Sequence, residues 1–189
     1  SCKRIAFTST STVYGEPTQF PTPEDYGPLL PISLYGASKL GCEALISAYA
    51  QAFGMKAIIC RLANIVGARS RHGVIWDFTR KLHEQPERLE ILGDGRQAKS
   101  YLLVDDCVEA LLLALRETKK PVEVYNVGSE DQVSVTAIAH AVAAIMSSQN
   151  VSFQYITPVE GGGGWSGDVR TMLLDISKLK RLGWRPKHN

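Results

Sequence analysis

Apolar and polar residues follow one another in blocks that predict strands and helices in alternation. Residues 4–9 and 56–60 are short apolar runs typical of buried parallel strands, and residues 34–53 between them predict a long helix. Ser33 is placed to cap that helix and Gly54 to end it. A strand–helix–strand order is typical of βαβ units, so the chain is predicted to form a doubly wound α/β sheet.

The rest of the chain continues the alternation in shorter pieces. Further helices are predicted at 74–84, 106–117, 134–147 and 175–180, and further strands at 122–127 and 151–156. Asp105 or Asp106 is expected to cap the helix at 106–117, and Ser134 the helix that follows. Loops rich in Pro and Gly are expected at 15–31 and 161–164.

Composition and charge narrow the class of protein. The 189 residues are 44% hydrophobic and 21% charged, and the formal net charge is only +2 with the basic residues scattered, which argues against a nucleic-acid binder. No apolar run is long enough to span a membrane. No Cys-x-x-Cys or paired His occurs, so no metal site is expected. The four cysteines, Cys2, Cys42, Cys60 and Cys107, are expected to be reduced thiols of a cytoplasmic protein.

The strongest chemical signal is the segment Tyr35-Gly36-Ala37-Ser38-Lys39. Residues four apart share a helix face, so the Lys39 ammonium is expected beside the Tyr35 phenol. A nearby cation favours the phenolate, which makes a tyrosine a usable base near neutral pH. Such a pair also arises by chance, and its surroundings decide between the two interpretations. Hydroxyl residues 8–12 and the polar segment 61–67 each follow a predicted strand, where open α/β sheets bind ligands.

These three blocks, in this order and spacing, resemble the nucleotide-sugar epimerase/dehydratase branch of the extended short-chain dehydrogenase/reductases. The resemblance covers essentially the whole chain. Supporting blocks are Gly93–Gly95 with Ser100–Asp106, Tyr125–Gly128, Gly167–Val169, Asp175–Lys178 and Leu182–Pro186. The family implies that residues 1–67 are the C-terminal part of a Rossmann NAD-binding domain. It implies that residues 68–189 are mainly a smaller mixed α/β nucleotide-sugar-binding region, with 104–128 returning to the Rossmann sheet.

The resemblance also implies roles for individual residues. Tyr35 would be the acid/base on a sugar hydroxyl, Lys39 would bind the nicotinamide ribose, and Thr10 would bind the reacting sugar oxygen. The residues implied to contact the cofactor NAD are Tyr35, Lys39, Thr8, Ser9, Leu62 and Ala63. Those implied to contact the nucleotide sugar are Thr10, Asn64, Val74, Ile75, Lys99, Tyr101 and Asp168. Structural alternatives stay open: Thr10 as one hydroxyl of a turn, Asn64 as a loop tie, and Tyr101 and Asp168 as packing residues.

The subtype depends on two positions after Thr10. Relatives that dehydrate sugars carry Asp-Glu there, whereas this chain has Ser11 and Thr12 and so lacks an acid to expel water. The expected reaction is therefore epimerisation of the UDP-glucose/UDP-galactose 4-epimerase kind. Three departures bear on the substrate: Lys99 and Trp165 stand where relatives carry a diphosphate Arg, with Arg170 near the second, and Leu103 replaces a common His.

The family's Gly-rich NAD-binding turn has no counterpart in the expected context. A Gly-x-Gly-x-x-Gly match at Gly162, Gly164 and Gly167 lies outside any βαβ unit and is interpreted as accidental. With Ser1 leading almost directly into a strand, the chain is expected to be a C-terminal portion that is inactive alone. A natural non-catalytic nucleotide-sugar binder, or a dehydratase or reductase, remains the alternative. Relatives pair through the helix corresponding to 34–53, which implies a homodimer.

Overall fold

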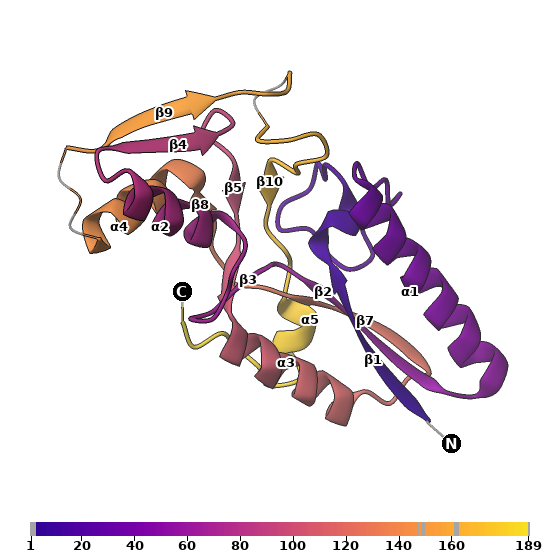
Figure 1. Ribbon diagram of the computed structural model, residues 1–189. Coiled ribbons are helices and arrows are strands. Elements are labelled where there is room, and N and C mark those ends of the chain that lie inside the picture. The colour runs from indigo at the N-terminus through magenta and orange to yellow at the C-terminus, as the bar shows by residue number, and fades with distance from the viewer. Residues whose placement is uncertain (1–2, 147, 149, 161–162, 189) are drawn as a thin grey trace. The chain divides into compact units, whose positions relative to one another are not determined.

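The computed structural model describes residues 3–146, 148, 150–160 and 163–188, and divides the chain into two compact units (Figure 1). Unit 1 comprises Ser1–Val66, Ser100–Gln132 and Met172–Asn189, and unit 2 comprises Gly67–Lys99 and Val133–Thr171. The chain therefore leaves unit 1 and returns to it twice. Cys2 and Gly162, considered above, lie outside the described residues, as does Ser147 at the end of the predicted helix 134–147.

Unit 1 is built on three parallel strands in the order β1-β2-β7. Its elements are β1 (Arg4–Thr10), η1 (Ser11–Tyr14), α1 (Leu34–Phe53), β2 (Lys56–Leu62), β3 (Asn64–Val66), β6 (Tyr101–Leu103), α3 (Val104–Glu117), β7 (Val122–Val127) and α5 (Ser177–Lys180). Ser9 lies opposite Arg61, and Arg61 opposite Asn126, so polar residues from all three strands meet at their carboxyl ends. The short strands β3 and β6 form a second parallel pair.

Helices cover both faces of the main sheet, which confirms the doubly wound α/β prediction. Successive residues of β2 point to opposite faces. Arg61 bonds to Glu43 of α1, whereas Cys60 lies near Cys107 of α3. Burial, reinforced by Cys107, raises the pKa of the Cys60 thiol to about 12, so this cysteine behaves as a small apolar core residue.

The long helix begins and ends where the sequence predicts. The Ser33 hydroxyl accepts a hydrogen bond from the Gly36 N–H at 3.0 Å, and Gly54 has the left-handed backbone of a C-cap. Along twenty residues α1 buries only Gly36, Glu43 and Ala50, which are spaced seven apart on one narrow stripe. Large apolar side chains elsewhere on the helix, Leu34, Leu45, Tyr49 and Phe53, are exposed.

Three sequence expectations need correction in unit 1. The first strand is not buried, because β1 is a sheet edge paired only with β2, and Ile5 is 36% exposed. Helix α3 begins at Val104 and has no side-chain cap, so neither Asp105 nor Asp106 caps it. The terminal helix starts at Ser177, whose N–H is bonded to the Asp175 carboxylate.

Asp106 instead anchors the C-terminal residues of the described chain. It is 1% exposed, and its Oδ2 accepts hydrogen bonds from the Lys187 N–H at 3.0 Å and the His188 N–H at 3.1 Å. The Trp184 indole N–H bonds to the Asp106 carbonyl at 3.2 Å. Burial alone would raise the pKa of Asp106, but the hydrogen bonds from Lys187 and His188 outweigh it and lower the pKa. These contacts hold the C-terminal segment, up to His188, in unit 1.

Unit 2 is a smaller α/β assembly. Its elements are α2 (Val74–Glu84), β4 (Arg88–Leu92), β5 (Ala98–Lys99), β8 (Val133–Ser134), α4 (Val135–Ile145) and β9 (Ser152–Ile156). Strands β4 and β9 pair in parallel, β5 and β8 pair antiparallel, and α2 packs against α4. The chain returns to unit 1 through β10 (Thr171–Met172). Of the helices in the described residues, none combines the length and the apolar character needed to cross a bilayer.

Two glycines of α1 should respond oppositely to alanine. A Cβ at Gly36 would lie 2.8 Å from the Thr12 carbonyl oxygen, whereas a Cβ at Gly41 meets nothing within 4 Å. Gly41→Ala should raise the free energy of unfolding by about 0.5–1 kcal/mol, because it removes a flexible residue from a helix interior. Gly36→Ala should lower it by about 1–3 kcal/mol through overpacking. Urea denaturation of both variants measures this, and effects of the same sign would contradict the close packing at Gly36.

The Asp106 anchor predicts a pH-dependent stability. Because its pKa is lowered in the folded state, its contribution is complete above the ordinary value of about 3.9 and is lost as pH falls through the lower folded pKa. Asp106→Asn should destabilise the chain by about 1–3 kcal/mol at neutral pH, because a neutral amide oxygen makes weaker hydrogen bonds to the Lys187 and His188 N–H groups than a carboxylate does. The deficit should shrink in urea titrations below about pH 4. A deficit that is constant with pH would show that the carboxylate charge is not involved.

Candidate functional site

The predicted Tyr-Lys pair lies on the first two turns of α1. The Tyr35 side chain is 55% exposed, and the Lys39 Nζ lies 5.8 Å from the centroid of its ring. The Lys39 ammonium donates to the Thr8 carbonyl oxygen of β1 at 2.7 Å and lies 4.8 Å from the centre of the Phe7 ring. The helix thus presents an accessible phenol beside a cation whose position is fixed from the sheet.

The hydroxyl residues at the end of β1 have distinct tasks. Thr10 caps η1: its Oγ1 accepts from the Thr12 N–H at 3.3 Å and lies 3.2 Å from the Thr12 hydroxyl. The Ser9 hydroxyl is buried and donates to Glu43 Oε1 at 2.5 Å. Thr8 engages Lys39 through its backbone carbonyl, so the carbonyl of Thr8 and the hydroxyl of Ser9 are both committed to residues of α1.

The end of β2 is equally well anchored. The Ala63 N–H bonds to the Val127 carbonyl at 2.8 Å, and Leu62 pairs in register with Val127. Both the backbone N–H and the side-chain amide of Asn64 donate to the Ser100 carbonyl, at 3.2 and 3.1 Å. This is the loop tie considered as the structural alternative for Asn64. It also gives the Asn64 side chain a fixed orientation opposite Tyr101, its register partner on β6.

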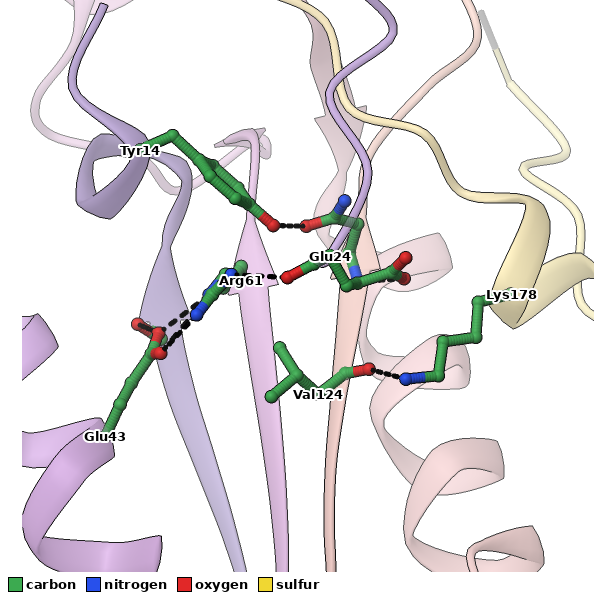
Figure 2. Close-up of polar contacts among 8 residues, drawn as sticks. Tyr14, Glu24, Glu43, Arg61, Val124 and Lys178 are labelled. Carbon is green, nitrogen blue, oxygen red and sulfur yellow. Dashed lines mark hydrogen bonds and ion pairs between the residues drawn. The ribbon is translucent and has the colours of Figure 1, made fainter. Parts of the chain in front are cut away.

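A buried ion pair lies between α1 and β2, which the sequence did not indicate. The Arg61 Nη2 is 2.7 Å from Glu43 Oε2, and Nε lies 3.1 and 3.2 Å from the two carboxylate oxygens. Both side chains are about 95% buried. Burial opposes the charge of Arg61, but the Glu43 hydrogen bonds and the nearby Tyr14 raise its pKa further, so it stays protonated. Figure 2 shows Glu43 reaching Arg61 from the helix side.

The same arginine fixes the irregular segment 15–31. Its Nη1 donates to the Glu24 carbonyl at 3.1 Å, and its guanidinium lies 4.8 Å from the centre of the Tyr14 ring (Figure 2). The Tyr14 hydroxyl donates to Asn126 Oδ1 at 2.7 Å, and the Asn126 N–H donates to the Glu24 carboxylate at 2.9 Å. Burial raises the pKa of Tyr14 to about 12, so it is a neutral structural donor and not a base.

Unit 2 contributes a second cluster, around Lys99. The Lys99 Nζ is 2.5 Å from Asp168 Oδ1, and Asp168 Oδ2 accepts the Gly164 N–H at 3.0 Å. The Asp168 side chain is only 2% exposed. Trp165, 57% exposed, has its ring centre 5.2 Å from the same ammonium. Lys99 and Asp168, predicted separately as substrate contacts, are therefore partners of each other.

The remaining predicted residues of unit 2 lie on α2 and in the segment 164–170. Val74 and Ile75 form the first turn of α2, and Ile75 is exposed. Arg170, expected to compensate for Trp165, is 2.7 Å from Asp94 Oδ2, and Asp94 Oδ1 accepts the Arg96 N–H. Gly164 and Gly167 of the accidental glycine motif belong to the segment that wraps Asp168, and Gly167 has a positive φ.

These features define the class of protein. A doubly wound parallel sheet, polar groups at the carboxyl ends of its strands and a Tyr-x-x-x-Lys pair on the next helix are those of a Rossmann-type short-chain dehydrogenase/reductase. Residues 1–128 match the NAD dependent epimerase/dehydratase family. The chain belongs to that family, as its sequence blocks indicated.

Proteins of similar sequence show which members of the family this chain resembles. An uncharacterised UDP-glucose epimerase of Bacillus subtilis is 31% identical over 182 residues, which are 96% of this chain and 55% of that protein. A putative UDP-glucose 4-epimerase of Methanocaldococcus jannaschii is 32% identical over 189 residues, covering 97% of this chain and 58% of that protein. This chain therefore spans little more than half the length of these relatives.

Solved structures similar to this chain also include UDP-galactose and UDP-glucose 4-epimerases. A crystal structure of UDP-galactose 4-epimerase is 41% identical with a TM-score of 0.87, covering 99% of this chain and 59% of that one. The Thermotoga maritima UDP-glucose 4-epimerase with UDP-glucose is 34% identical with a TM-score of 0.85, covering 99% and 59%. The Thermus thermophilus enzyme in complex with NAD is 31% identical with a TM-score of 0.82, covering 99% and 60%.

Proposed function

We propose that this chain carries the catalytic pair of an NAD-dependent nucleotide-sugar epimerase of the UDP-glucose/UDP-galactose 4-epimerase kind. The observation that carries the proposal is the accessible Tyr35 phenol beside a Lys39 ammonium that is held by the sheet. The similarity to UDP-glucose 4-epimerases across almost the whole chain supports it.

In this proposal Tyr35 moves a proton at its phenolic oxygen. The phenolate accepts the proton of a sugar hydroxyl and returns it to the same oxygen at the end of the reaction. The Lys39 charge favours the phenolate form of Tyr35. The hydrogen bond from Lys39 to the Thr8 carbonyl holds the ammonium in place beside the tyrosine. Thr10, the cap of η1, sits on the element against which the start of α1 packs and would bind the same sugar oxygen.

The donors present fit the nicotinamide ribose of NAD. An ammonium has three N–H donors, and the Thr8 carbonyl accounts for one of those on Lys39. Lys39 and Tyr35, together with Thr8, Ser9 and the backbone of Leu62 and Ala63, would hold that part of the cofactor. NAD, when bound, accepts and returns hydride at the sugar carbon.

Epimerisation is preferred to dehydration because η1 offers no acid. Ser11 is buried and Thr12 contacts Thr10, so the two residues after Thr10 present hydroxyls where a dehydrating relative needs carboxylates. For the nucleotide sugar we propose Asn64 and Tyr101 from unit 1, and Val74, Ile75, Lys99 and Asp168 from unit 2. Their chemistry suits a diphosphate and a base: one cation, amide and hydroxyl donors, and apolar surface.

We also propose a homodimer and a cytoplasmic location. Leu45, Tyr49 and Phe53 form an exposed apolar strip on α1 that a second copy would cover. Tyr49 and Phe53 already contact each other, with ring centres 4.4 Å apart. Cys42, Cys60 and Cys107 are free thiols, as expected where thiols stay reduced.

Tyr35→Phe tests the catalytic assignment. The chain should be fused behind the NAD-binding half of a related epimerase and assayed for conversion of UDP-galactose with NAD. The substitution should lower turnover at least about a hundredfold, because the phenolic proton carrier is lost. Tyr49→Phe, an exposed tyrosine of the same helix, is the matched control and should leave turnover unchanged. Near-normal activity of Tyr35→Phe would remove Tyr35 from the mechanism.

The substrate assignment can be tested on the 189-residue chain alone. Calorimetry should detect weak binding of UDP, and Lys99→Met should weaken it by roughly three- to tenfold through loss of a charge-assisted hydrogen bond to phosphate. Lys81→Met removes another lysine of unit 2, one paired with Asp77, and should have little effect. The absence of heat with millimolar UDP, or equal losses in the two variants, would exclude Lys99 as a phosphate ligand.

A further inference from the structure

Helix α1 carries a third polar residue, Glu43, in line with Tyr35 and Lys39. Tyr35, Lys39 and Glu43 follow one another at four-residue intervals and lie along one stripe of the helix. Tyr35 is exposed, Lys39 is partly buried and Glu43 is fully buried, so the stripe runs from the reacting group into the protein.

Among the three buried residues of α1, Glu43 is the one whose side chain is long enough to bond to the sheet and so oppose rotation of the helix about its axis. The other two buried positions, Gly36 and Ala50, have little or no side chain to interlock with the sheet. A rotation of about 15° would move a group at the outer radius of a helix, about 5–6 Å, by about 1.5 Å. That displacement is enough to break the hydrogen bond between Lys39 and Thr8.

The contact that Lys39 makes with β1 is repeated by Glu43 one helical turn further along. Two consecutive residues of β1 bond to two successive turns of α1. The Thr8 carbonyl accepts a hydrogen bond from Lys39, and the Ser9 hydroxyl donates one to Glu43. On its other side the Glu43 carboxylate accepts hydrogen bonds from two nitrogens of Arg61, Nε and Nη2 (Figure 2). Arg61 is itself held by the Glu24 carbonyl, so it does not move with the helix.

A buried ion pair stabilises a fold no better than apolar residues of the same volume, but it is directional. The orientation of this ion pair is important because Glu43 lies one helical turn from Lys39, the lysine beside the proposed catalytic phenol. We propose that Glu43, oriented by Arg61, is a positioning residue that sets Lys39, and through it Tyr35, in the geometry for proton transfer. The catalytic meaning of this role rests on the proposed function, whereas the positional claim does not.

The test reads the Lys39 ammonium directly in the 189-residue chain. Its 1H–15N side-chain signal, assigned by its loss in Lys39→Arg, should show the hydrogen bond to Thr8 at mildly acidic pH and low temperature. Glu43→Gln should move that signal to the position of the exposed lysines. Glu123→Gln is the matched control, because it breaks another largely buried pair of unit 1, with Lys178, and should leave the Lys39 signal in place.

Each outcome decides the proposal. A Lys39 signal that is unchanged in folded Glu43→Gln, or that moves equally in Glu123→Gln, overturns it. If Glu43→Gln does not fold, the double variant Glu43→Met with Arg61→Met supplies apolar groups of similar volume and should fold with the Lys39 signal displaced. Failure of both to fold, or an unmoved signal in the double variant, would show that the pair serves stability alone. These readouts use no turnover, so they fail independently of the Tyr35 assay.

Discussion

The contact between Arg61 and Glu43 is the constraint on which the Tyr35–Lys39 end of unit 1 depends. Two opposite charges are buried there at the carboxyl ends of parallel strands, and removing charges from water is costly unless each charged nitrogen and oxygen finds a partner. The surrounding atoms meet that condition: carboxylate oxygens take Arg61 and Ser9, the Glu24 carbonyl takes another guanidinium N–H, and the Tyr14 ring covers its face. Such a cluster tolerates only one arrangement of its elements.

That rigidity explains how a segment without regular structure can lie beside α1 in a fixed position. Residues 15–31 contain no helix or strand, so their backbone groups need partners from elsewhere. Asn126, fully buried at the end of β7, supplies one such partner and two further contacts: its side-chain amide donates to the carbonyls of Thr22 and Asp175, and its backbone N–H donates to the Glu24 carboxylate. One asparagine therefore joins the loop and the C-terminal segment to the same strand end that Arg61 joins to α1.

The elements that sequence predicts well are those set by local chemistry. Ser33 and Gly54 mark both ends of α1, and Ser134 caps α4 as expected, because caps depend on neighbours a few residues away. Asp106 was misassigned because its partners lie about eighty residues further along the chain. Glu43 was missed for a similar reason: on an amphipathic helix a glutamate resembles a solvated residue, and only the fold brings Arg61 beneath it. The exposure of β1 likewise depends on what pairs with its edge, which its own residues do not encode.

The two charged clusters of the chain differ in how accessible their charges are. Arg61 has its charge matched by Glu43 at a buried site, where its side chain is only 5% exposed, so it can hold a position but is shielded from solvent. Lys99 also faces a carboxylate, yet one bond to Asp168 leaves two of its N–H donors, and the ammonium lies at the side of an exposed Trp165 ring. Because Asp168 offsets the charge, Lys99 presents directed N–H donors more than net positive charge. An arginine in its place would offer a planar fork to two acceptor oxygens at once. A lysine beside a tryptophan instead presents a single point charge next to the face of an aromatic ring, which is a different combination of polar and flat apolar surface.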